Sequence, residues 1–63
     1  MKRVVIYPKD VQQITGKSER YGRALLKQIK TKLNKEQHQF ITIDEFSLFT
    51  GIAPEHIHPF IIN

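Results

Sequence analysis

The stretch that decides the fold is residues 15–35, TGKSERYGRALLKQIKTKLNK. Gly16 can adopt the left-handed conformation that ends a helix, and Ser18 is a favoured N-cap for the next helix. Glu19 places a negative charge in the first turn of that helix, where the helix dipole favours it. This order of residues predicts the turn and second helix of a helix-turn-helix, with the second helix running from residue 19 to about residue 34.

A helical wheel divides the predicted second helix into two opposite faces. Its apolar face is one continuous arc of six residues: Tyr21, Gly22, Leu25, Leu26, Ile29 and Leu33. Its other face has four cations: Arg20, Arg23, Lys27 and Lys30. Because like charges three and four residues apart repel one another, a bound polyanion would relieve the repulsion.

The length and composition predict one small domain. The chain has 63 residues and no cysteine, so neither a disulfide nor a thiolate zinc site can stabilise it. No apolar run approaches the roughly 18 residues of a membrane span. The first ten residues, MKRVVIYPKD, lack the features of a signal peptide, so we expect a cytoplasmic protein.

The charges are unevenly distributed along the chain. All ten lysines and arginines lie in residues 1–35 with only two acidic residues, which gives 10 − 2 = +8. Residues 36–63 have four acidic residues and no lysine or arginine, which gives −4. Such asymmetry indicates an acidic partner for the basic half, and nucleic acid is the commonest one.

The residues before the basic stretch predict a strand and a first helix. Val4, Val5 and Ile6 form an apolar, β-branched run that is too short for a helix. Pro8 ends this run and is favoured at the first position of a helix. We therefore expect a helix over residues 8–15.

The same order of signals returns after a polar connector. Residues 40–43 predict a second strand, and Thr42 with Glu45 has the spacing of a helix-capping box. A short apolar helix then ends at Gly51. Pro54 opens a fourth helix at its first position.

A shift of 35 residues aligns the two halves, so that Gly16 falls on Gly51. We therefore predict a mainly α single domain of two helix-turn-helix-like units, a basic unit over residues 1–35 and an acidic unit over residues 36–63. The two short strands are expected to pair as a small two-stranded antiparallel sheet between the units. The alternative is a chance alignment, because such patterns are common.

Two segments, ITGKS at residues 14–18 and RYGRALL at residues 20–26, are similar to a known motif. Through them, residues 8–29 resemble the helix-turn-helix of the excisionase and MerR-like families. The second helix of those proteins lies in the DNA major groove, so the resemblance implies DNA-facing positions for Ser18, Glu19, Arg20, Tyr21 and Arg23. Gly22 stands where those families usually have a branched apolar residue, and a glycine there allows close helix contact. The whole chain also resembles a group of short bacterial proteins, which implies no activity.

Our first functional hypothesis is binding of double-stranded DNA, as a regulator or a recombination-associated factor. It uses the second helix and the turn before it, through Lys17, Ser18, Arg20, Tyr21, Arg23, Lys27 and Lys30. Arg20, Tyr21 and Arg23 are expected to approach the groove, and the three lysines to contact flanking phosphates. The simplest alternative is a solvated cationic surface. Tyr21 also has an alternative role in core packing, because it borders the apolar face.

The second hypothesis is a protein-interaction or homodimerisation module that binds no nucleic acid. The acidic, aromatic second half of the chain would then be the binding surface. The apolar residues Phe60 and Ile61 near the C-terminus either close the core or form an exposed patch for a homodimer.

Metal binding and catalysis are not expected. His56 and His58 are two residues apart, a spacing that separates them on a helix, and no cysteine completes a metal site with them or with His38. There is no glycine-rich phosphate loop, and helix capping explains Asp44 and Glu45. We therefore predict no enzyme, no catalytic residue, no metal and no cofactor.

Overall fold

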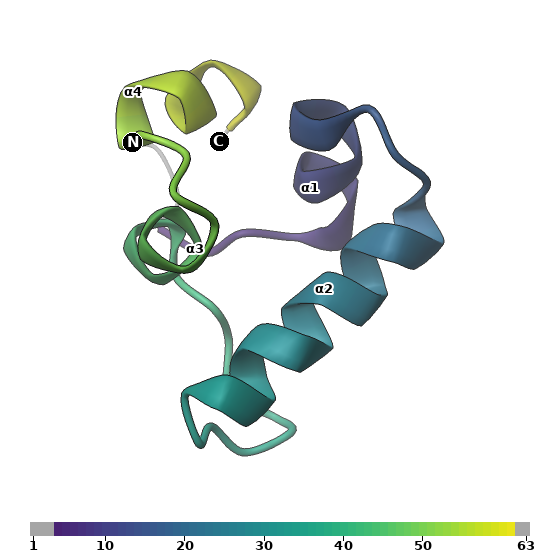
Figure 1. Ribbon diagram of the computed structural model, residues 1–63, viewed down its shortest axis with the longest axis vertical. Coiled ribbons are helices and arrows are strands. Elements are labelled where there is room, and N and C mark those ends of the chain that lie inside the picture. Colours follow the sequence, from purple (N-terminus) through teal and green to yellow (C-terminus); the bar gives the residue numbers. More distant parts are fainter. Residues whose placement is uncertain (1–3, 62–63) are drawn as a thin grey trace.

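The fold consists of two helical hairpins, as seen in a computed structural model that describes residues 4–61. The first hairpin is α1 (Pro8–Thr15) and α2 (Glu19–Lys32). The second is α3 (Ile43–Thr50) and α4 (Pro54–Ile57), which continues into the 3₁₀ turn η1 (His58–Phe60). Figure 1 shows the hairpins on opposite sides of the molecule, with the segment before α1 crossing between them.

The first hairpin has the predicted boundaries at its turn. Gly16 has φ 75° and follows the last residue of α1, so it adopts the left-handed conformation. Ser18 Oγ then accepts a hydrogen bond from the backbone N–H of Tyr21 at 3.1 Å, which caps α2. The end of α2 is two residues earlier than predicted. Asn34 has φ 57°, a left-handed conformation that asparagine tolerates and that cannot continue a helix.

The predicted two-stranded sheet is wrong. Residues 4–61 contain only one isolated antiparallel bridge, between Val5 and Thr42. Two backbone hydrogen bonds flank it, from Ile6 N–H to the Ile41 carbonyl at 3.0 Å and from the N–H of Ile43 to the carbonyl of Val4 at 2.8 Å.

Helix initiation on both sides explains why the pairing does not extend into strands. Thr42 is already the N-cap of α3, so its segment turns into a helix at once. On the other segment, Pro8 is the first residue of α1 and has no N–H to donate. Pro8 lies 35 residues before Ile43, the residue whose N–H donates across the bridge.

The first helices of the two hairpins begin in the same way, 35 residues apart. The backbone N–H of Tyr7 donates to Asp10 Oδ2 at 2.8 Å, and that of Thr42 donates to Glu45 Oε1 at 2.9 Å. In each case a carboxylate at the third helical position satisfies the N–H of the N-cap residue. The buried side chain of Asp10 therefore has a structural role.

The ends of these helices also match at the same offset. The hydroxyls of Thr15 and Thr50 each donate to the carbonyl four residues earlier, at 2.7 and 2.8 Å. Gly16 and Gly51 follow with φ 75° and 81°. The second helices differ, because α4 has four residues and an N-cap, Ala53, that makes no side-chain hydrogen bond.

The core lies between the hairpins and draws on both of them. Its buried residues are Ile6, Val11, Leu26, Ile29, Ile41, Ile43, Phe46, Ile57 and Ile61. The wheel for α2 is correct at its centre, since Gly22, Leu26 and Ile29 are buried, whereas Tyr21 and Leu33 at its edges are exposed. Ile61 is buried and Phe60 is half-buried, so the end of the described chain helps to close the core.

Gly22 lies at the closest approach of α1 and α2. A Cβ atom at this position would be 2.6 Å from the backbone carbonyl oxygen of Pro8. Because that oxygen belongs to the backbone, it has little freedom to move aside. The absent side chain is therefore what allows α2 to pack so closely against the start of α1.

Candidate nucleic-acid interface

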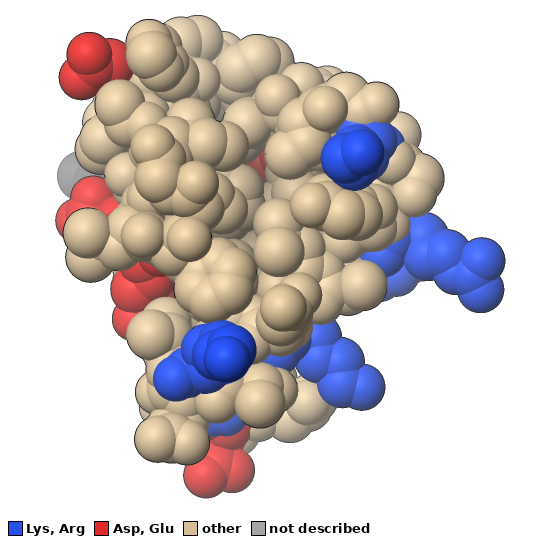
Figure 2. Space-filling view, viewed as in Figure 1, with Lys and Arg blue, Asp and Glu red and all other residues tan. Residues whose placement is uncertain are grey.

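Four of the five cations of α2 lie on one side of the helix, and we call them the α2 basic face: Arg20, Arg23, Lys27 and Lys30. Burial of Leu26 and Ile29 fixes the rotation of the helix and so turns these cations away from the core. The first three are exposed and Lys30 is half-buried. In Figure 2, lysine and arginine side chains lie mainly over the half of the molecule formed by α1 and α2. Most acidic side chains in this view lie over α3 and α4.

The charge of this face is only lightly compensated. Arg23 forms an ion pair with Glu19 at 3.3 Å, but both side chains are well exposed, and such pairs contribute only a few tenths of a kcal/mol. Lys30 Nζ donates to the carbonyl oxygen of Gln37 at 2.9 Å, which satisfies one donor without neutralising the charge. The side chains of Arg20 and Lys27 make no hydrogen bond or ion pair to any residue of the described range 4–61.

The turn before α2 and the first turn of α2 place the remaining predicted residues, Lys17, Ser18 and Tyr21, at one end of this face. Lys17 Nζ lies 5.4 Å from the centre of the Tyr21 ring, within cation–π distance. Tyr21 is 40% exposed and therefore does not belong to the buried core. Ser18 uses its oxygen to cap α2, which leaves its hydroxyl proton as the group that could contact a ligand.

An open groove runs beside the α2 basic face, with a volume of about 420 Å³. From α2 it is lined by Arg23, Lys27 and Lys30, and from two other segments by Tyr7 and Phe40. The two aromatic side chains are 44% and 63% exposed. The sequence pattern did not predict this site, because its residues come from three segments that only the fold brings together.

The base of the groove is apolar. Ile6, Leu26 and Ile41 contribute to its lining, and all three side chains are buried. A ligand in the groove would therefore meet apolar surface at the base and positive charge along α2. This combination suits a molecule with flat apolar groups and several negative charges.

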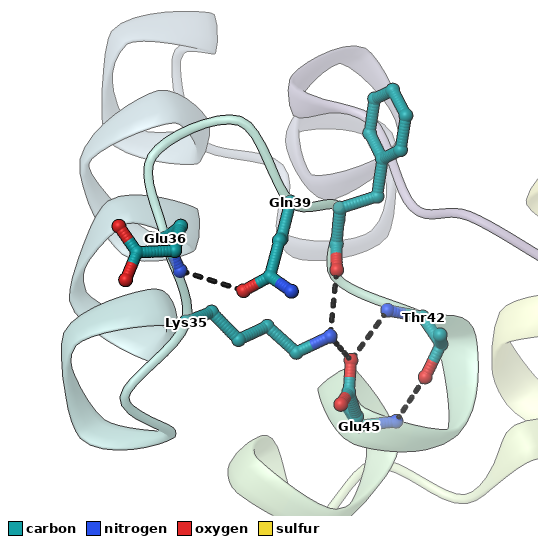
Figure 3. Close-up of polar contacts among 6 residues, drawn as sticks. Lys35, Glu36, Gln39, Thr42 and Glu45 are labelled. Carbon is teal, nitrogen blue, oxygen red and sulfur yellow. Dashed lines mark hydrogen bonds and ion pairs between the residues drawn. The ribbon is translucent and has the colours of Figure 1, made fainter.

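A polar network fixes the loop that carries Phe40 (Figure 3). Lys35 Nζ contacts Glu45 Oε1 at 2.9 Å and donates to the carbonyl oxygen of Phe40 at 2.8 Å. The N–H of Glu36 donates to Gln39 Oε1 at 2.7 Å within the same loop. The loop between α2 and α3 is therefore held at several points.

Glu45 is central to this network. Its carboxylate accepts hydrogen bonds from the backbone N–H of Thr42 and from Lys35, and its own N–H donates to Thr42 Oγ1 at 3.0 Å. The hydrogen bond from the Thr42 backbone, with a further contribution from Lys35, lowers the pKa of Glu45. Glu45 is therefore ionised at neutral pH and holds the loop to α3.

Other kinds of site have little support in residues 4–61. No three histidine, cysteine or acidic side chains of this range come together as metal ligands. His38, His56 and His58 are all exposed. Within the same range, no helix has the length and apolar character needed to cross a membrane.

Comparison with known proteins adds no family assignment. The chain matches no protein-family model, no curated protein and no solved structure. The resemblance of residues 8–29 to excisionase and MerR-like proteins therefore stays a prediction. A function must be inferred from the α2 basic face and the groove themselves.

Proposed function

We propose that the protein binds double-stranded DNA through α2. The observation that carries the proposal is the α2 basic face, a row of four cations, three of them exposed, on the second helix of a helix-turn-helix hairpin. The row belongs to a half-chain with a charge of +8, and the other half has a charge of −4. A polyanion would replace the repulsion within the row by attraction.

Each predicted residue has a position that suits a role in this complex. Arg20 and Arg23 are exposed on the N-terminal half of α2, the part of a recognition helix that usually approaches base edges. Tyr21 extends the same surface. Lys17 in the turn and Lys27 further along α2 suit contacts to phosphates on either side, with Ser18 and Lys30 beside them.

The test is a salt titration of binding to a short blunt duplex. We expect the logarithm of the binding constant to fall linearly with the logarithm of salt concentration, by about 0.9 for each phosphate contacted. The double variant Arg20→Ala with Arg23→Ala should weaken binding, whereas Lys17→Ala with Lys27→Ala, which removes two proposed phosphate contacts, should reduce this slope by about 2. Fluorescence anisotropy on a labelled duplex measures both quantities.

Lys9→Ala provides the matched control. Lys9 is an exposed cation of α1, and its replacement removes a charge without touching the α2 basic face. It should change the affinity far less than a single Arg20→Ala substitution. A protein that binds no duplex even at low salt, or that loses as much affinity with Lys9→Ala as with Arg20→Ala, would contradict the proposal.

One observation favours a second candidate function, a protein-interaction or homodimerisation surface on the second half. Leu48 on α3 is 86% exposed, and Phe49 beside it is also exposed. The same short helix has Asp44 on its surface, so it presents apolar and acidic groups together. Such a surface suits a partner with apolar and basic groups.

A further inference from the structure

We infer that the groove beside α2 binds an unpaired nucleic-acid strand, in addition to the duplex proposed for the N-terminal half of α2. This inference rests on the proposed function in one respect, which is that the ligand is a nucleic acid. The groove shares Arg23, Lys27 and Lys30 with the α2 basic face and adds the aromatic residues Tyr7 and Phe40. Neither aromatic residue lies on α2.

The arrangement of the lining matches the chemistry of a single strand. Arg23, Lys27 and Lys30 succeed one another at about one helical turn, so positive charge recurs along the groove roughly every 5.4 Å. A single strand has a phosphate at every nucleotide along one edge and a base along the other. Phosphates on the α2 cations would therefore direct the bases towards Tyr7 and Phe40.

A paired duplex cannot use these aromatic side chains. Its bases are stacked and hydrogen-bonded inside the double helix, so their faces are covered. An unpaired base has two free faces, and stacking on an aromatic side chain is a sequence-tolerant source of affinity. The groove volume of about 420 Å³ lies in the lower part of the range of ligand sites, which suits unstacked bases.

The backbone of the loop that carries Phe40 is held in place before any ligand binds. The backbone carbonyl of Phe40 accepts a hydrogen bond from Lys35, and Lys30 holds the carbonyl of Gln37 in the same loop. Phe40 nevertheless leaves 63% of its surface in water. A stacked base would cover this apolar surface at little cost in ordering the loop.

The experiment compares three labelled ligands at the same low salt concentration: a twelve-nucleotide oligo(dT), a blunt duplex, and the same duplex with a single-stranded overhang. The intact chain should bind the overhang duplex several-fold more tightly than the blunt one. Phe40→Ala should weaken oligo(dT) binding about tenfold, in proportion to the loss of one stacked base. The same substitution should change blunt-duplex binding less than twofold.

Two further variants make this result specific. Phe40→Tyr keeps an aromatic ring and should retain oligo(dT) binding. Leu48→Ala removes another highly exposed apolar side chain, on α3, and should leave the affinity for oligo(dT) and for the blunt duplex unchanged. Because Phe40 and Leu48 are both exposed, neither alanine variant removes core packing.

The outcomes distinguish the two proposals. Duplex binding that depends on Arg20, together with oligo(dT) binding that Phe40→Ala leaves unchanged, would overturn this inference and keep the proposed function. If the protein binds oligo(dT) but no duplex, and Phe40→Ala abolishes this binding, the result would support single-strand binding in the groove and contradict the duplex proposal. An acidic aromatic peptide that displaces oligo(dT) at equal concentration and matches its affinity would show that the groove is a peptide site, and would overturn the inference.

Discussion

Gly22 shows how a single missing side chain determines a helix crossing. In the interior of a helix, replacing glycine by alanine normally stabilises a protein by about 1 kcal/mol. Here the added Cβ would lie 2.6 Å from the carbonyl oxygen of Pro8. We therefore expect Gly22→Ala to lower the free energy of unfolding by about 1–3 kcal/mol, as overpacking does elsewhere. Urea unfolding followed by circular dichroism measures this change.

The control lies two residues further along the same helix. Ala24 is exposed, so Ala24→Gly should cost only the helix propensity of about 1 kcal/mol. The two opposite exchanges, Gly22→Ala and Ala24→Gly, should thus both destabilise the protein. A Gly22→Ala protein more stable than the parent chain would show that propensity outweighs the close contact.

Gly22 also marks a limit of sequence analysis. A family-like motif contained a glycine in place of a branched apolar residue, and the wheel placed it on the apolar face. Neither observation could identify Pro8 as the neighbouring backbone, because that contact depends on how two helices cross. The cap at Ser18 and the turn at Gly16 were predictable because their geometry depends on residues nearby in sequence.

The N-terminus of α3 contains Glu45, a carboxylate that should make the stability of the fold depend on pH. Glu45 has a lowered pKa, so its contribution to stability is complete above the pKa of a glutamate in the unfolded chain, about 4.3. It is lost as the pH falls through the lower pKa of the folded state. Glu45→Gln should therefore cost stability on the order of 1 kcal/mol at pH 7 and less at pH 3.

Urea unfolding of both chains at the two pH values tests this prediction. Glu55→Gln is the matched control, since Glu55 is an exposed glutamate in the first turn of α4. It should cost less than Glu45→Gln at pH 7. A cost of Glu45→Gln that stays the same at pH 3 would show that the charge of this carboxylate does not stabilise the fold.

The predicted strands do not form because of the helices that follow them, and not because of the residues that compose them. Val4, Val5 and Ile6 have the composition of a strand, and one bridge does form at Val5. Helix starts at Pro8 and Ile43 leave no room on either segment for a longer ladder. Both helix starts were recognised in the sequence, but their effect on strand length required the two segments to be placed side by side.

Across the whole molecule, the second candidate function makes a prediction about self-association. If α3 forms a homodimer surface, the intact chain should dimerise and Leu48→Lys should shift it to the monomer, because the substitution places a charge in an apolar contact. Sedimentation equilibrium measures the dimer constant. Lys9→Ala, on the other hairpin, should leave it unchanged. A monomer at high protein concentration would contradict homodimerisation.

The groove marks the second limit of prediction from sequence. The four cations of the α2 basic face were identified because helical periodicity alone places them on one face. Tyr7 and Phe40 were not identified, because they precede two different helices and lie 33 residues apart in the chain. Their common site exists only once the two hairpins are packed together. Periodicity therefore reveals surfaces built from one helix and overlooks those assembled from several segments.

The bridge between Val5 and Thr42, the only one within residues 4–61, has a consequence for stoichiometry. Beside it, the N–H of Ile6 donates to the carbonyl of Ile41, and these two residues are themselves 35 apart, so an exchange of the two halves maps this residue pair onto itself. The chain thus resembles a dimer whose two members have been fused and have diverged. Only one member keeps a long second helix and its cations. A ligand that recognises this helix should therefore occupy one site per chain, without a twin on the opposite side of the molecule.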